Sequence, residues 1–107
     1  MKTYTDLEQS KKLAKILPIE SADMFYNPRP SNEIPYIGNT NTALLQVPCW
    51  SLAALLAVLP NYEINNFGDG IQLDVNNKTL ATEGDETLLD LVVNMIIYLH
   101  ELNLLRL

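Results

Sequence analysis

The chain has 107 residues, the length of one small domain, and 48% of them are hydrophobic, which excludes a chain disordered throughout. Its 13 acidic and 7 basic residues give a net charge of −6, which argues against nucleic-acid binding because that function requires a basic surface. A single cysteine excludes an internal disulfide. Because charged and amide residues interrupt the most apolar stretch and no apolar run follows the N-terminus, we expect no membrane span and a cytoplasmic protein.

The first predicted element is a helix over residues 5–17. Thr5 and Glu8 have the spacing of a capping box, in which each side chain accepts a hydrogen bond from the backbone N–H of the other residue. Pro18 disfavours helical geometry in the residue before it and should end the helix.

The next two segments carry weaker signals. Residues 19–26 fit either a short helical turn or an extended strip that packs on the core. Residues 27–42 are rich in proline and asparagine and follow neither the helix nor the strand period, so we predict a Pro/Asn-rich loop. A loop of this length is either an insertion or ordered surface loop, or a binding loop.

The middle of the chain predicts a buried helix of about nine residues. Ser51 is placed to cap its N-terminus, Trp50 and Leu55 have the spacing of a hydrophobic staple, and Pro60 closes it. Pro48 would also be acceptable as a first helical residue, so an earlier start remains open.

Two or three antiparallel strands follow. Side chains alternate along residues 62–67 and again along 71–75, and residues 79–82 are a third short candidate. The sequence Gly-Asp-Gly at 68–70 and the residues at 76–78 supply turn signals between them.

The last predicted helix runs from about Glu86 to Asn103, with Asp85 as its cap. Its apolar stripe is wider than one sheet face requires. Either the helix lies at the centre of the domain, or its second side contacts another chain, which leaves a homodimer open.

These elements predict one α+β domain over residues 1–107, with two or three antiparallel strands packed against about three helices. The predicted core residues are Leu13, Ile16, Leu17, Trp50, Leu52, Leu55, Leu56, Leu59, Ile71, Leu73, Val75, Leu88, Val92, Met95, Ile96 and Leu99.

Candidate catalytic residues are few. Cys49 is the one thiol and His100 the one imidazole, so a nucleophile–base pair would have to join them. One cysteine and one histidine are too few for a zinc site, and the acidic residues have no calcium-loop spacing. We therefore predict no catalytic, metal or cofactor-binding residues.

The charge is unevenly distributed along the chain. Residues 1–50 are balanced, whereas residues 51–107 carry eight acids against Lys78 and Arg106. This acidic half suits a soluble surface, a basic partner or mimicry of nucleic acid.

Three blocks of sequence resemble a group of small proteins without an assigned activity. The blocks are DLEQSKKLAKILPIESADMFY, PCWSLAALLAVLP and MIIYLHELNLL, in that order. The group is encoded in gut Bacteroidales genomes and, in related forms, in their phages and mobile elements. The resemblance implies an accessory protein of a prophage or mobile element and no particular catalytic residue.

The functional expectation is a non-enzymatic module that binds another protein. The sequence places its contact surface at Tyr36 and at four acids around the start of the last helix, Glu83, Asp85, Glu86 and Asp90. The alternatives are a small-ligand-binding domain with a pocket between sheet and helices, and a small enzyme that uses Cys49, His100 or the acidic residues.

Overall fold

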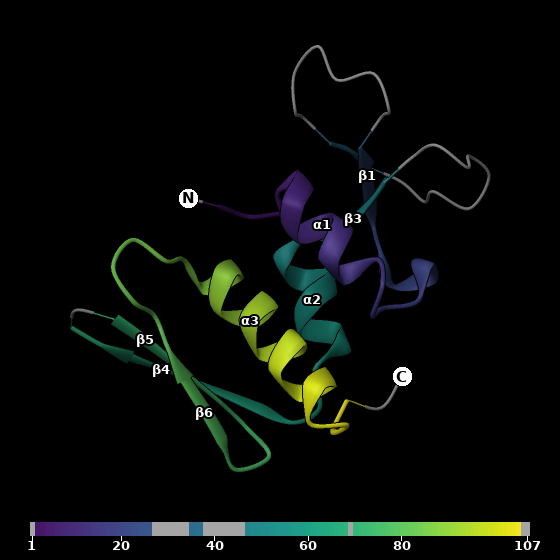
Figure 1. The fold of residues 1–107 in the computed structure, drawn as a ribbon. Coiled ribbons are helices and arrows are strands. Elements are labelled where there is room, and N and C mark those ends of the chain that lie inside the picture. The colour runs from purple at the N-terminus through teal and green to yellow at the C-terminus, as the bar shows by residue number, and fades with distance from the viewer. Residues whose placement is uncertain (1, 27–34, 38–46, 69, 106–107) are drawn as a thin grey trace.

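The computed structural model of the protein describes residues 2–26, 35–37, 47–68 and 70–105. Within these ranges the chain forms helices and two antiparallel sheets (Figure 1), so the predicted α+β class is confirmed. In chain order the elements are helix α1 (Leu7–Leu13), a 3-10 turn (Ile19–Ser21), strands β1 (Met24–Tyr26), β2 (Tyr36–Ile37) and β3 (Val47–Cys49), helix α2 (Leu52–Val58), strands β4 (Tyr62–Phe67), β5 (Gly70–Val75) and β6 (Lys78–Ala81), and helix α3 (Leu88–Glu101).

The two sheets lie on opposite sides of the helices (Figure 1). One has the strand order β4-β5-β6 and is the predicted meander, with three strands. The other, of order β2-β1-β3, was not predicted. It forms because the segment at 24–26 is extended and pairs on one side with residues 47–49 and on the other with Tyr36–Ile37. Tyr36–Ile37 lies within the predicted loop, so the loop prediction is wrong at these two residues. Of the other loop residues, Pro35 is described and buried, and residues 27–34 and 38–42 lie outside the described residues.

The tight turn between β5 and β6 consists of Asn76 and Asn77. Both have positive φ angles, 48° and 69°. A two-residue turn of this kind matches the twist of the flanking strands, and asparagine tolerates the left-handed conformation better than most residues.

Helix α3 is the central element of the domain. Strands β5 and β6 pack on one side of it, and α1 and α2 pack on the other (Figure 1). Both sides of its wide apolar stripe are therefore covered by other elements of the same chain. Its cap is Thr87, which forms a capping box with Asp90, rather than Asp85 as predicted. Its buried residues are Leu89, Leu91, Val92, Val93, Met95, Ile96 and Leu99.

The start of α1 differs from the prediction. The capping box pairs Asp6 with Gln9, one position later than the predicted pair of Thr5 and Glu8. Thr5 is instead fully buried in a polar cluster, where its hydroxyl is needed for other contacts. The α-helix ends at Leu13, and the residues after it form tighter turns before Pro18.

Helix α2 begins as predicted, because Ser51 Oγ accepts a hydrogen bond from the N–H of Ala54 at 3.2 Å. It has seven residues rather than about nine. Pro48 lies in β3, so the earlier start is wrong.

The core joins both halves of the chain. Every predicted core residue is buried except Ile16, Leu52, Leu56, Ile71 and Leu88, which are partly buried and pack against the core. The predicted core list omits Cys49, Leu89, Leu91 and Val93, which are also buried. Ala22 and Tyr26 are buried too, in agreement with the alternative in which residues 19–26 pack on the core.

Among the described residues, no helix is long and apolar enough to cross a bilayer.

Candidate functional site

Cys49 lies in a buried polar cluster between α1, β1 and β3. Its Sγ donates to the backbone carbonyl of Thr5 at 3.4 Å, and the Thr5 hydroxyl lies 3.5 Å from the same sulfur. The Thr5 hydroxyl also contacts Ser10 Oγ at 2.7 Å and accepts from the N–H of Trp50 at 3.1 Å. Tyr26 completes the cluster by donating to the Thr5 carbonyl at 2.7 Å. The cluster thus joins the N-terminal segment to both β1 and β3.

The surroundings of Cys49 do not favour thiol chemistry. Burial raises the pKa of the thiol, and burial likewise raises the pKa of Tyr26. Cys49 has no exposed surface, whereas His100 is exposed near the end of α3, and no hydrogen bond joins them in the described part of the chain. The structure therefore does not bring the two candidate catalytic residues together.

Asp90, one of the predicted surface residues, is held by contacts within the domain. Its Oδ1 accepts from Lys2 Nζ at 2.8 Å and from Gln9 Nε2 at 2.9 Å, while Oδ2 accepts from the Thr87 N–H at 3.0 Å. Burial opposes ionisation, but these donors lower the pKa of Asp90 to about 2. Its carboxylate therefore anchors the N-terminal segment to α3.

The other predicted surface residues differ in their surroundings. Glu86 accepts from the Glu83 N–H at 2.8 Å and from Asn94 Nδ2 at 3.1 Å, so it braces the loop before α3. Glu83 and Asp85 are exposed. The backbone of Tyr36 pairs with Phe25 in the small sheet, and the structure does not describe the side chain of Tyr36.

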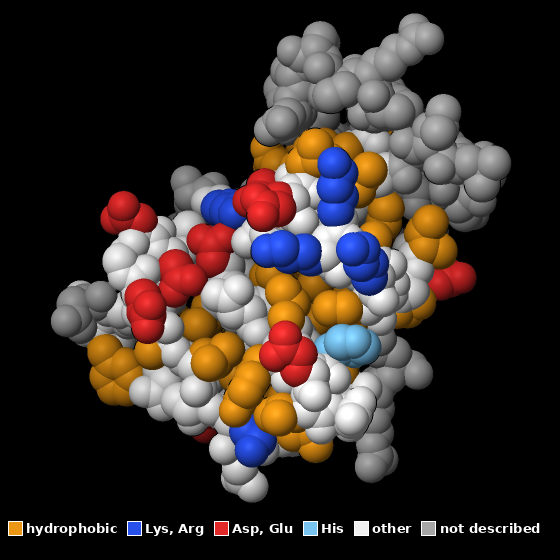
Figure 2. All heavy atoms as spheres, in the orientation of Figure 1, with side chains coloured by type: hydrophobic (Ala, Val, Ile, Leu, Met, Phe, Trp, Pro, Cys, Tyr) orange, Lys and Arg blue, Asp and Glu red, His pale blue; other side chains and the backbone are white. Residues whose placement is uncertain are grey.

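Exposed lysines lie over α1 together with Glu8 and Asp6, which pair with Lys12 and Lys2. Further carboxylates gather over the loop before α3 (Figure 2). In the described ranges, no group of three or more His, Cys, Asp or Glu side chains is positioned to share a metal ion. Two further carboxylates, Glu63 and Asp74, lie in the three-stranded sheet.

The orientation of the backbone groups in this sheet follows from its contacts at β6. Thr82 N–H donates to the Ile71 carbonyl at 2.9 Å, and the Ile71 N–H donates to Thr82 Oγ1 at 3.0 Å. The main-chain groups of Ile71 therefore face β6. Since successive residues of a strand direct these groups to opposite sides, Gln72 and Asp74 face β4. Their cross-strand partners Asn65 and Glu63 face back toward β5.

Within the described part of the chain, strand β4 consequently presents a free edge. The N–H and C=O groups of Tyr62, Ile64 and Asn66 point away from β5, and among the described strands only β5 pairs with β4. The strand has six residues, and its pairing is regular from Tyr62 to Phe67. It contains neither proline nor lysine, two of the devices that usually protect an exposed edge.

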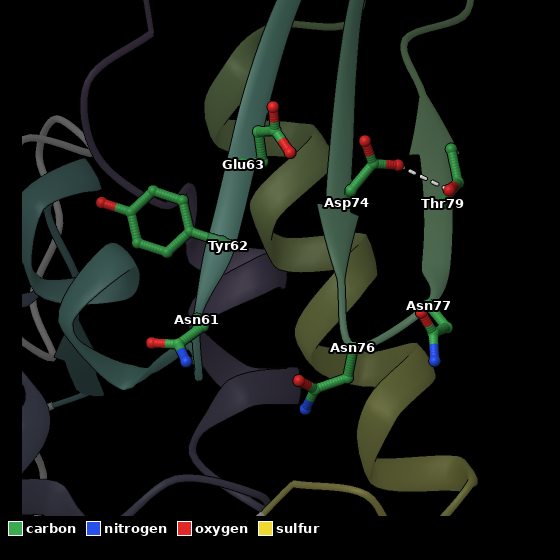
Figure 3. A pocket seen from close by; sticks show the side chains of 7 residues that line it. All are labelled: Asn61, Tyr62, Glu63, Asp74, Asn76, Asn77 and Thr79. Atoms are coloured by element: carbon green, nitrogen blue, oxygen red, sulfur yellow. Dashed lines mark hydrogen bonds between the residues drawn. The ribbon is translucent and has the colours of Figure 1, made fainter.

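The side chains at this edge alternate between two faces. Ile64 shares a face with buried Leu73 and points toward the helices, whereas Glu63 and Asn65 lie on the outer face. Glu63 is directly opposite Asp74 in the sheet, and Figure 3 shows the two carboxylates on neighbouring strands.

A shallow hollow of about 490 Å³ surrounds this carboxylate pair. Asp74 accepts from Thr79 Oγ1 at 2.5 Å, from Gln72 Nε2 at 3.2 Å and from Asn65 Nδ2 at 3.4 Å. These donors, Thr79 foremost, hold the pKa of Asp74 below its usual value, so the group is ionised at neutral pH. The residues that line the hollow are Asn61, Tyr62, Glu63, Asp74, Asn76, Asn77 and Thr79 (Figure 3).

A second hollow, of about 520 Å³, lies where α2 and α3 end. Its lining includes Leu59, Pro60 and Leu104, with Asn76 and Asn103 at its polar side. The hollow therefore lies at the surface, between the ends of the two helices and the turn of the three-stranded sheet. Deeper between α3 and the sheet, Leu73 and Val75 have no exposed surface.

No local pattern in the sequence indicates the free edge at β4. Alternation within residues 62–67 predicts a strand, but which strands lie at the edges depends on the pairing of the whole sheet. Comparison of the chain with family models, curated proteins and solved structures finds no match.

Proposed function

We propose that the protein is a non-enzymatic interaction module that binds a partner protein. An extended segment of the partner pairs with the free edge of β4 as an additional strand. The observation that carries this proposal is the row of outward-facing N–H and C=O groups at Tyr62, Ile64 and Asn66. Such an edge binds an extended segment through main-chain hydrogen bonds, and the flanking side chains select its sequence. The resemblance to proteins of mobile elements makes an accessory role in such an element the proposed context.

The opposite edge of the sheet is a weaker candidate for this role. Strand β6 has four residues against six in β4, and it begins with Lys78. Short length and an edge lysine are both features that discourage strand addition. The length and composition of β4 therefore favour it as the docking strand.

A pair of variants at Asn66 tests the proposal. The Asn66 N–H faces the free edge, and the side chain is exposed. Asn66→Pro therefore removes a hydrogen-bond donor that the partner would use, and it breaks no hydrogen bond to β5. Asn66→Thr keeps the N–H and suits a strand. Both variants should keep the circular dichroism spectrum of the parent.

The measurement is affinity capture from cells that produce the protein, followed by hydrogen exchange on the purified complex. We expect a stoichiometric partner with the parent and with Asn66→Thr, and loss of that partner with Asn66→Pro. In the complex, the amides of Ile64 and Asn66 should exchange more slowly. Retention of the partner by folded Asn66→Pro, or protection confined to other elements, would contradict strand addition at β4.

A further inference from the structure

The outer side of the β4 edge carries negative charge that the fold leaves unbalanced. Glu63 and Asp74 are directly opposite each other, and neither forms an ion pair with a described residue. Like charges in this arrangement destabilise a sheet. Lys78, the one basic residue in the three strands, pairs with Val75 on the other face. A cationic side chain placed beside Glu63 would relieve this repulsion.

The inner side of the same edge is apolar at Tyr62 and Ile64, and it becomes polar at Asn66, which lies on the same face at the end of the strand. Ile64 is only partly buried although it packs against the core, and the Tyr62 side chain is 43% exposed. Figure 3 shows the Tyr62 ring extending away from β5, beyond the edge of the sheet. A strand added here would place every second side chain next to these two residues and bury their remaining apolar surface.

We infer that the occupant of this edge is an extended segment of a partner protein in which basic and apolar side chains alternate. This inference rests on the strand addition proposed above and adds the chemistry of the partner. The basic side chains lie on the outer face near Glu63, and the apolar ones lie on the inner face near Ile64 and Tyr62. The period of two follows from the alternation of side chains along a strand.

Selection from a displayed library of random octapeptides tests the inference. The library is selected on the Asn66→Thr variant and counter-selected on Asn66→Pro, so the retained peptides are those that require the free N–H at the edge. We expect the enriched peptides to alternate lysine or arginine with aliphatic or aromatic residues. Enriched peptides without basic residues, or without alternation, would overturn the inference and leave strand addition intact. No enrichment on Asn66→Thr over Asn66→Pro would instead overturn strand addition itself.

The affinity of the most enriched peptide then tests the role of Glu63. In fluorescence anisotropy at low salt, Glu63→Gln should weaken binding roughly two- to fivefold, the effect of one exposed charge pair. Glu83→Gln makes the same change of charge at an exposed residue of the loop before α3 and should leave the affinity within about the error of the measurement. Equal affinities for the parent and Glu63→Gln would contradict contact with the basic side chains.

A second copy of the chain is the competing occupant. Light scattering of the parent at increasing concentration should report the mass of a monomer. A dimer that is lost in Asn66→Pro and kept in Asn66→Thr would show that β4 pairs with itself, which would overturn the inference of a basic partner.

Discussion

Lys2 Nζ lies 2.8 Å from Asp90 Oδ1, an ion pair between residues 88 positions apart in the chain. The same oxygen accepts from Gln9 on α1, so one carboxylate connects the N-terminal segment, the first helix and the last helix. The acid that the sequence suggested as part of a contact surface is therefore a structural anchor.

Replacing Asp90 should give a pH-dependent loss of stability. The pKa of Asp90 falls from 3.8 to about 2 on folding, so its contribution is present above about pH 4 and is lost as the pH falls through 2. With allowance for solvent screening, we expect Asp90→Asn to lower the free energy of unfolding by about 1–2 kcal/mol at pH 6. Urea titrations at pH 6 and pH 2 check this. An equal difference at both values would contradict it, and Glu101→Gln at an exposed site is the control.

The buried hydroxyl of Thr5 should be needed for stability. Thr5→Val keeps the shape of the side chain but leaves Ser10 Oγ and the Trp50 N–H without this partner. We expect a loss of about 1–3 kcal/mol, the cost of unsatisfied buried polar groups. Thr5→Ser keeps the hydroxyl and should lose less, about 1 kcal/mol for the missing methyl. Fluorescence of Trp50 during urea unfolding measures both variants, and the reverse order of stability would refute the role of the hydroxyl.

Cys49 should be inert in the folded protein. It has no exposed surface and burial raises its pKa, so little thiolate is available to a reagent such as Ellman's. We expect labelling at pH 8 to be at least about 100-fold slower than in 6 M guanidinium chloride. Rapid labelling without denaturant would mean that the thiol is accessible and would revive it as a candidate nucleophile.

Truncating the core should be costly at the positions that have no exposed surface. Leu55→Ala and Ile96→Ala should each lower the free energy of unfolding by about 2–5 kcal/mol. Leu102→Ala, at a side chain that is 42% exposed, should change it by less than about 1 kcal/mol. Urea denaturation compares the three, and losses below about 1 kcal/mol at both buried sites would contradict the core assignment.

The turn between β5 and β6 should respond to backbone conformation. Asn77 has a φ of 69°, a region that disfavours residues with a Cβ atom, and asparagine tolerates it better than alanine. Asn77→Ala should therefore destabilise by about 1 kcal/mol, whereas Asn77→Gly should be neutral or stabilising. Thermal unfolding distinguishes them. Equal melting temperatures for the two variants would show that the turn relaxes.

Local signals predicted the helices and the meander because they depend on neighbouring residues. The leucine spacing in α2, its Ser51 cap and the alternation in β5 are patterns of this kind. The small sheet was missed because it joins residues 24–26 to residues 47–49 across the predicted loop, and no local period reports such a pairing. For the same reason Thr5 was interpreted as a cap.

The candidate site depends even more on pairing. The sequence identified Glu63 and Asp74 only as acids in an acidic half. Their opposition follows from the register of β4 and β5, and the free edge follows from the order of three strands. Charge alone predicts Asp90 as a surface residue, and charge does not distinguish a residue that contacts a partner from one that anchors the fold.

The anchoring of the N-terminal segment also determines when folding can finish during synthesis. Thr5 N–H bonds to the Trp50 carbonyl at 2.9 Å, and Lys2 reaches Asp90. Lys2 and Thr5 must therefore wait until residue 90 has also left the ribosome before all their native contacts exist. Contacts of such sequence separation slow folding, so we expect the nascent chain to remain incompletely folded until α3 has emerged.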